Sequence, residues 1–253
     1  MSPTSAVPAL TRTRAKLIPV VEIFGPTIQG EGAEAGVPTH FVRVGGCDYR
    51  CVWCDTMYAV DPEVVRTTSE RLSSRDIVDR VTSLNGRPSW TTISGGNPAL
   101  HDLGELVEGL RAAGFRVSVE TQGSLWKPWL GEVDRLTISP KPPSSGMVTS
   151  RHDEQLRGFM AAAFDACADR AVLKVVIFDE IDLEWASDVA RRWPDLALHL
   201  SAGTPVPAGD DVRDVVGDRY RWLCEEVGLR PALADVRVLP QLHVIAWKGA
   251  IGV

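Results

Sequence analysis

The chain has 253 residues, of which 44% are hydrophobic and 24% charged, and its formal net charge at pH 7 is −6. This length can bury a sizeable core and suits one α/β domain or two small ones, of which we predict one. The acidic balance and the lack of a basic run exclude a protein that holds nucleic acid through its overall field. No apolar run is long enough to cross a bilayer, so we predict neither nucleic-acid nor membrane partners.

Residues 1–17 are rich in Ser, Thr, Pro, Ala and Arg but lack the continuous apolar stretch of a secretory signal. We therefore predict a flexible N-terminal tail over 1–17 and a single domain over 18–253. Two of the five cysteines, Cys167 and Cys224, lie in helical-looking segments far from the other three. That spacing does not indicate a disulfide framework and fits the reducing cytoplasm.

The first apolar segment, residues 17–24, leads into a glycine- and proline-rich stretch over 25–32. This stretch carries two long polar side chains, Gln29 and Glu31. It is either a surface turn or a loop whose backbone and carboxylate approach a ligand closely.

A β-branched, alternating segment over 39–44 predicts the next strand, with Arg43 near its end. Arg43 is either a solvated edge charge or a ligand for an anionic substrate through its planar guanidinium. The strand leads into a loop over 45–55 that contains three cysteines within eight residues: Cys47, Cys51 and Cys54.

Three thiols this close together indicate an iron–sulfur site more than a zinc site. Structural zinc usually takes four ligands in two separated pairs, whereas each of three thiolates in one loop can bind a different iron of a cube. The fourth iron is then open and can bind a small molecule. The alternatives are three buried structural thiols, or a zinc site completed from afar by His101, His199 or His243.

The rest of the chain alternates helices and strands. Predicted helices cover about 74–84, 103–110, 152–168, 182–192 and 210–227, and predicted strands cover 90–93, 115–119, 135–138, 172–178, 196–200 and 236–239. Ser73 and Asp76 give the first helix its capping chemistry. Short connections between such elements imply parallel strands with helical crossovers. About six βα units are too few for a closed eight-unit barrel, so we predict an open, partial TIM-like barrel.

In such a barrel the active site lies at the carboxyl ends of the strands. The unusual turns of this sequence fall there: the cysteine loop and residues 94–98, 120–123, 139–141 and 201–204. One glycine- or proline-rich turn is a weak signal, but five at the same structural position, one with three cysteines, predict a site.

The Cys-x3-Cys-x2-Cys loop resembles that of the radical S-adenosylmethionine (SAM) enzymes, in which the open iron takes the amino and carboxylate groups of SAM. From about Ile18 to the C-terminus the chain is also similar to the 7-carboxy-7-deazaguanine synthases, a radical SAM family of queuosine and related deazapurine biosynthesis. Four motifs carry this resemblance: residues 22–32 (EIFGPTIQGEG), 93–100 (ISGGNPAL), 139–145 (SPKPPSS) and 237–243 (RVLPQLH).

The resemblance implies conversion of 6-carboxy-tetrahydropterin to 7-carboxy-7-deazaguanine with loss of ammonia. It implies a 4Fe-4S cluster, SAM and Mg²⁺ as cofactors, and a flavodoxin or ferredoxin-type reductant. Reductive cleavage of SAM would give a 5′-deoxyadenosyl radical that takes a hydrogen from the pterin, and hydrogen return would regenerate SAM. A homodimer is expected from the resemblance alone.

The resemblance also assigns residues to each ligand. Cys47, Cys51 and Cys54 would hold the cluster, and Thr56, which otherwise reads as a cap, would supply an oxygen to Mg²⁺. The SAM site would consist of Trp53, Cys54, Asp55, Gly96, Asn97, Glu120, Ser139, Pro140, Lys141 and Ser201. The pterin site would consist of Ile28, Gln29, Gly30, Glu31, Arg43, Ser94 and His243.

Chemistry supports some of these roles and leaves alternatives for others. Glu120 can accept two ribose hydroxyls, or is an ordinary charge at a strand end. An acid and an amide, Glu31 and Gln29, suit the donor and acceptor pattern of a guanine-like edge, and Arg43 suits the substrate carboxylate. His243 is otherwise a satisfied structural histidine.

Three features depart from the pattern of related enzymes. Asn97 stands where many radical SAM enzymes have Glu, so a neutral amide replaces a carboxylate near the SAM ammonium. Ser201 stands where some members carry a longer Gln. The chain ends in Ile251-Gly252-Val253 instead of a proline that reaches the pterin, so we assign the terminus no role.

Two other functions compete with this one. A radical SAM activase that makes a glycyl radical on a partner protein would need a docking surface, whereas the loop at 28–32 with Arg43 suits a small anionic ligand. An iron–sulfur or zinc sensor of macromolecules would be expected to show a basic patch or a recognition helix, and the sequence shows neither.

Overall fold

The computed structural model describes residues 16–204, 212–248 and 250. Its strands are β1 (Ile18–Ile28), β2 (Pro38–Val44), β3 (Glu70–Leu72), β4 (Trp90–Gly95), β5 (Arg116–Thr121), β6 (Arg135–Ile138), β7 (Ala171–Ile177), β8 (Leu198–Ala202) and β9 (Arg237–Leu239). Its α-helices are α1 (Pro62–Thr68), α2 (Ser74–Ser83), α3 (Gly104–Ala112), α4 (Ser150–Cys167), α5 (Glu180–Arg192), α6 (Val212–Gly228) and α7 (Leu242–Trp247).

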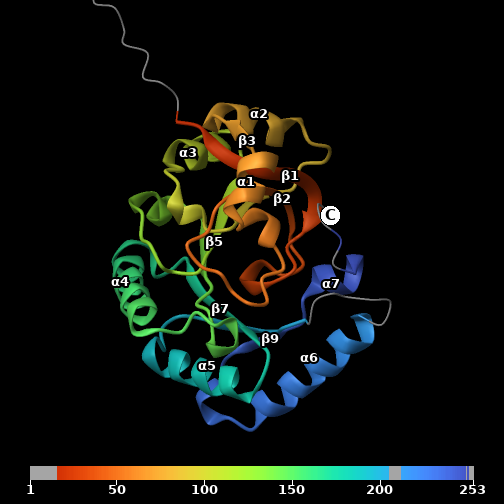
Figure 1. Cartoon of the computed structure of the whole chain (residues 1–253), viewed down its shortest axis with the longest axis vertical. Helices are drawn as coiled ribbons and strands as arrows, with labels where there is room; N and C mark the ends of the chain where they lie inside the picture. The colour runs from red at the N-terminus through yellow and green to blue at the C-terminus, as the bar shows by residue number, and fades with distance from the viewer. Residues whose placement is uncertain (1–15, 205–211, 249, 251–253) are drawn as a thin grey trace, which may run out of the picture.

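In the described part of the chain, all nine strands form one sheet in the order β3-β1-β2-β4-β5-β6-β7-β8-β9. From β2 to β9 each neighbouring pair is parallel, whereas β1 is antiparallel to both β2 and β3. Helices α2 to α6 follow one another around the periphery of the sheet (Figure 1). Since β3 and β9 are edge strands that do not pair with each other, the barrel is open, and this confirms the predicted fold class.

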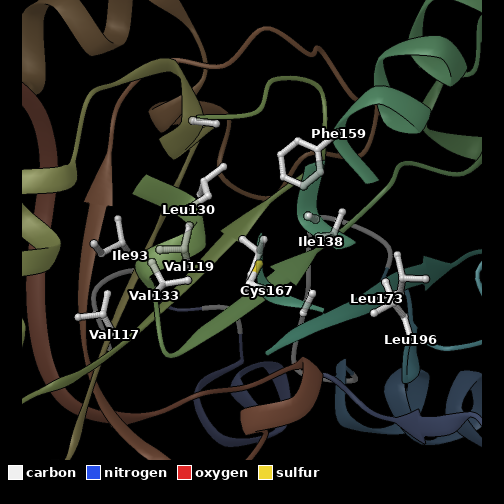
Figure 2. Packing of buried hydrophobic residues seen from close by; sticks show 14 of the residues in the cluster. Ile93, Val117, Val119, Leu130, Val133, Ile138, Phe159, Cys167, Leu173 and Leu196 are labelled. Atoms are coloured by element: carbon white, nitrogen blue, oxygen red, sulfur yellow. The ribbon is translucent and has the colours of Figure 1, made fainter. Parts of the chain in front are cut away.

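The parallel strands alternate between an apolar and a polar face, because successive side chains point to opposite sides of a sheet. Figure 2 shows the apolar face in the core, where residues from successive strands pack against the helices and loops outside: Ile93, Val117, Val119, Ile138 and Leu173 against Leu130, Phe159 and Leu196. The opposite face is polar, with Thr92 hydrogen-bonded to Ser118 at 3.2 Å. Cys167, which was predicted to lie in a helix far from the cysteine loop, is buried in this apolar core.

Every predicted helix and strand is present, with ends that agree with the prediction or differ by a few residues. The predicted start of α6 at 210 lies outside the described residues, as do residues 1–15 of the predicted tail and the terminal residues 251–253. Three short elements were not predicted: α1, β3 and α7. None of the described helices has the length and hydropathy of a membrane span.

The interpretation of residues 25–32 as a loop is wrong for its first half. The strand β1 continues to Ile28, because Thr27 and Ile28 pair with Thr39 and Pro38 of β2. The register shifts between Phe24 and Thr27, as in a β-bulge. Gly25 and Pro26, which local sequence signals assign to a turn, lie within this bulge.

Candidate active site

A cavity of about 500 Å³ opens at the carboxyl ends of the parallel strands. It is lined at successive strand ends by Arg43, Ser94, Glu120, Ser139 and Val176. This is the predicted location, and the volume is typical of a small-molecule site.

The three clustered cysteines, Cys47, Cys51 and Cys54, line one side of this cavity, and all three thiols are free. Backbone hydrogen bonds fix the loop that carries them: Gly46 N donates to Ala59 O at 2.8 Å, and Val52 N donates to Ser145 O at 3.1 Å. Three thiols from one fixed loop that line one cavity would fit an iron–sulfur cluster.

Burial raises the pKa of the Cys47 thiol to about 11 and also raises the pKa of Cys51. A thiol in this environment is protonated at neutral pH. Because a metal binds the thiolate, Cys47 and Cys51 would have to lose these protons to hold a cluster.

Of the three histidines in the zinc alternative, His243 lines the cavity with the cysteines, whereas His101 and His199 do not and make other contacts. His101 is hydrogen-bonded through its ring to Gly45 O at 2.8 Å, and the buried ring of His199 lies 3.3 Å from Leu173 O. Among the described residues no group of three His, Cys, Asp or Glu side chains is placed to hold a single metal ion.

Most residues predicted for SAM line the cavity: Trp53, Cys54, Asp55, Gly96, Glu120, Ser139 and Lys141. Trp53 is fixed by a 3.0 Å hydrogen bond from Nε1 to Ser144 Oγ, and Lys141 Nζ lies 5.9 Å from its ring centroid. Thr56, the predicted Mg²⁺ ligand, also faces the cavity, with its hydroxyl 3.6 Å from Cys54 Sγ.

Asn97, Pro140 and Ser201 are not among the residues that line the cavity. Asn97 is fully buried, and its amide is used inside the protein. Its Oδ1 accepts from Thr121 Oγ1 at 2.8 Å, and its Nδ2 donates to Asp48 Oδ1 at 2.9 Å. This placement differs from the predicted contact with SAM, because the amide instead joins the cysteine loop to the end of β5.

All residues predicted for the pterin line the cavity: Ile28, Gln29, Gly30, Glu31, Arg43, Ser94 and His243. The motifs at 22–32 and 237–243 meet here, since Leu242 N donates to Gly30 O at 3.1 Å. A Cβ on Gly30 would lie 2.2 Å from His243 Nδ1, so a side chain at this position would displace the histidine.

Glu120, which was predicted to bind SAM, contacts Gln29, which was predicted to bind the pterin. Its Oε1 accepts a 2.9 Å hydrogen bond from Gln29 Nε2, and its Oε2 lies 3.5 Å from Lys174 Nζ. The same ammonium bonds Glu31. The predicted ribose contact of Glu120 therefore competes with a place in this polar network.

Burial would raise the pKa of Glu31, but the charges of Lys174 and His243 and hydrogen bonds from Lys174 and Gln241 lower it to about 2. Burial likewise opposes the charge of Lys174, yet Glu120 and Glu31 raise its pKa above the ordinary value. Both groups of this pair are therefore ionised at neutral pH.

Sequence reasoning missed Lys174, Gln241, Glu22 and Tyr58. Lys174 had a detectable signal, because it is the one charged residue in the otherwise apolar strand Ala171–Ile177. Glu22 lies in the motif at 22–32 without a predicted role and Tyr58 lies in none of the motifs, because the roles of both come from a contact around Arg43 that only the fold creates.

Arg43 is held by groups on three sides. Its Nε donates to Glu22 Oε1, which also accepts the Tyr58 hydroxyl at 2.9 Å. The rings of Phe24 and Tyr58 lie 6.0 Å and 5.9 Å from its guanidinium carbon. Nε of Arg43 is therefore occupied by Glu22, and the side chain lines the cavity.

No protein-family model matches the chain. It is 40% identical to the 7-carboxy-7-deazaguanine synthase of Bacillus cereus over 93% of this chain and 99% of the relative. The same enzyme of Bacillus subtilis is 42% identical over 94% and 100%. This chain belongs to the 7-carboxy-7-deazaguanine synthase family.

Solved structures support the fold of this synthase-family chain. QueE from Escherichia coli has a TM-score of 0.61 at 24% identity, over 90% of this chain and 95% of that one. SuiB from Streptococcus suis, solved with S-adenosylmethionine, has a TM-score of 0.54 at 13% identity, over 80% and 50%. At these identities the likeness concerns the fold alone.

Proposed function

We propose that this chain is a radical SAM lyase that converts 6-carboxy-5,6,7,8-tetrahydropterin to 7-carboxy-7-deazaguanine with loss of ammonia, in the biosynthesis of queuosine and related 7-deazapurines. One observation carries the proposal: in a chain similar to these synthases over nearly its whole length, a three-cysteine loop and a Gln29–Glu31 loop face the same cavity. The first suits a cluster, and the second suits a guanine-like edge.

Cys47, Cys51 and Cys54 would hold a 4Fe-4S cluster, and Trp53 and Lys141, which line the same cavity, would help to bind SAM. When bound, the cluster and SAM supply the 5′-deoxyadenosyl radical that takes a hydrogen from the substrate. Thr56 would contribute its hydroxyl to Mg²⁺, which commonly takes few protein ligands. By the same family resemblance, we propose a flavodoxin or ferredoxin-type reductant, a homodimer and a cytoplasmic location.

The residues of this chain bind and orient the pterin. Arg43 would bind its carboxylate with the terminal guanidinium nitrogens, since Nε is held by Glu22. Ionised Glu31 would accept N–H groups of the pyrimidine edge, and Gln29 lies next to it in the same loop. Trp53 and Phe178, whose ring centroids lie 5.0 Å apart, both line the cavity and would exclude water from the reacting centre.

The test is anaerobic reconstitution with iron and sulfide, followed by incubation with SAM, Mg²⁺, a chemical reductant and 6-carboxy-tetrahydropterin. We expect 7-carboxy-7-deazaguanine by mass, and its loss in Cys51→Ala. Cleavage of SAM to 5′-deoxyadenosine without this product would move the substrate to another branch of the radical SAM enzymes, such as the glycyl radical activases. Neither product with an intact cluster would favour a binding protein, and metal analysis separates iron from zinc.

A further inference from the structure

We propose that Lys174 is a positioning residue for the pyrimidine edge of the substrate, which holds Glu31 and Glu120 side by side as two ionised hydrogen-bond acceptors. The inference rests on the proposed function, because it concerns how this cavity recognises a pterin. It adds a residue on β7 to a site that the sequence motifs place on other segments.

Lys174 is buried at the point where three segments meet. Its side chain is 6% exposed, and its Nζ contacts Glu31 Oε2 and lies 3.5 Å from Glu120 Oε2. Glu31 comes from the turn after β1 and Glu120 from the end of β5. One ammonium group therefore joins two carboxylates that are far apart in the sequence.

The second oxygen of each carboxylate is also fixed, in each case by a side-chain amide. Gln241 Nε2 donates to Glu31 Oε1 at 2.6 Å, and Gln29 Nε2 donates to Glu120 Oε1 at 2.9 Å. Each carboxylate oxygen has two lone pairs, so both groups keep acceptor capacity toward the cavity. The result is a rigid pair of acceptors, oriented by one cation and two amides.

Charge explains why a cation is needed between them. Two negative charges repel each other in a shared, partly buried site, so one of two neighbouring carboxyl groups normally retains its proton. A protonated carboxyl would present an O–H donor to the N–H donors of a guanine-like edge, which would oppose binding. With Lys174 in place, the three groups have a net charge of −1 and both acids are acceptors.

The charged and titratable groups around Lys174 are Glu31, Glu120 and Asp55, and His243 acts on Glu31 from α7. The pKa of Glu31 is lowered and that of Lys174 is raised, so neither changes its charge between pH 6 and pH 9. Removing the cation takes away the largest charge that lowers the pKa of Glu31, so burial then raises this pKa and the ionised form returns only as the pH rises.

The experiment measures the dissociation constant of 6-carboxy-tetrahydropterin for the anaerobically reconstituted protein between pH 6 and pH 9. It compares the wild type, Lys174→Met and a surface control, Lys16→Met. We expect the wild type and the control to have the same dissociation constant at each pH, so that every comparison is made with the wild type at that pH. For Lys174→Met we expect affinity to be about tenfold weaker at pH 6 and to recover toward pH 9, as one carboxyl loses its extra proton.

A Lys174→Met protein that binds as tightly as the wild type at every pH overturns the inference. A loss of affinity that is the same at every pH also overturns it, since that is what a merely structural lysine gives. If Lys174→Met does not fold, the double variant Lys174→Met/Glu31→Gln must regain a folded thermal transition, because it removes one of the two uncompensated acids. Failure of the double variant to do so overturns the inference.

The proposed function is judged separately in the same series. If the wild type does not bind the pterin at any pH, the proposed function and the role of Lys174 both fail. If the wild type binds it and Lys174→Met shows no pH dependence, only the role of Lys174 fails.

Discussion

Buried amides hold the cysteine loop through a single carboxylate oxygen. Asp48 Oδ1 accepts from Asn97 Nδ2 at 2.9 Å and from Gln122 Nε2 at 2.7 Å. Asn97 is fully buried, and Gln122 is 5% exposed, whereas Asp48 lies at the surface. A neutral amide at position 97 can donate to Asp48, and a carboxylate there cannot.

We therefore expect Asn97→Glu to weaken the attachment of the cysteine loop. The new carboxylate would face Asp48 and lose the donor, at a cost of about 1–3 kcal/mol in the free energy of unfolding. The measurements are urea unfolding of the metal-free protein and the rate of iron loss after reconstitution. Adding Asp48→Asn should restore much of the loss, and an Asn97→Glu protein as stable as the wild type would contradict this coupling.

Arg43 is held in position by its hydrogen bond to Glu22. We expect Glu22→Ala to raise the KM for the pterin about tenfold, equivalent to about 1.4 kcal/mol, because the guanidinium loses its Nε partner. Glu22→Gln keeps an acceptor oxygen and should lie between Glu22→Ala and the wild type. Tyr58→Phe removes only one hydroxyl and is the matched control. Equal KM values for all four proteins would show that Arg43 needs no such support.

At the scale of elements, the turn after β4 has no room for a side chain at its glycine, whereas two helices have room for one. A Cβ on Gly96, in the turn after β4, would lie 2.1 Å from Gly46 O. A Cβ on Gly158 in α4 or on Gly217 in α6 meets nothing within 4 Å. The turn needs close contact between two backbones, whereas the helices gain nothing from the missing side chain.

We expect Gly158→Ala and Gly217→Ala each to raise the free energy of unfolding by about 0.5–1 kcal/mol, because alanine restricts the unfolded chain and favours helix. Gly96→Ala should lower it by about 1–3 kcal/mol, because backbone must move to relieve the overlap. Chemical unfolding followed by circular dichroism measures all three. A stabilising Gly96→Ala would mean that the turn is not packed against the cysteine loop.

The long elements could be predicted from the sequence because periodicity decides them. The strand Arg135–Ile138 was predicted with its observed ends, and α2 begins at the capping box of Ser73 and Asp76. The second half of β1 could not, since Gly25 and Pro26 have the local signature of a turn, and only pairing with β2 extends the strand. Short elements such as α7 give too few residues for a period.

The candidate site was predictable as a set of motifs but not as a network. Parallel strands bring their carboxyl ends to one edge, so the shared position of the unusual turns follows from the fold class. The pairing of Glu31 with Lys174 and Gln241 joins residues 143 and 210 positions apart in the sequence. No local pattern in one sequence contains such a contact, and the same holds for the inward-turned amide of Asn97.

For the whole molecule, the Glu31 network links the N-terminal antiparallel strands to the last elements of the chain. Glu31 follows β1, Lys174 lies on β7, and Gln241 precedes α7. These contacts lie between the two ends of an open sheet, where no backbone ladder joins the edge strands β3 and β9. We expect the predicted single domain, residues 18–253, to unfold in one transition for this reason.

This network should make stability fall in acid. The pKa of Glu31 is about 2 in the folded protein, below its ordinary value of 4.5. Its contribution is therefore fully present above about pH 4.5 and is lost as the pH falls toward 2, by an amount on the order of 3 kcal/mol. Urea unfolding of the metal-free protein at a series of pH values from 6 to 2 measures the loss.

Other carboxyl groups titrate in the same range, so the informative quantity is the difference between the wild type and Glu31→Gln. The amide cannot titrate, and the substitution leaves the buried ammonium of Lys174 with one acidic partner fewer. Glu31→Gln should therefore be less stable than the wild type at pH 6. Its stability should then fall less steeply between pH 4.5 and pH 2, and the two curves should converge at the acid end. Parallel curves over this range would show that Glu31 is not held as an ionised group across the two ends of the sheet.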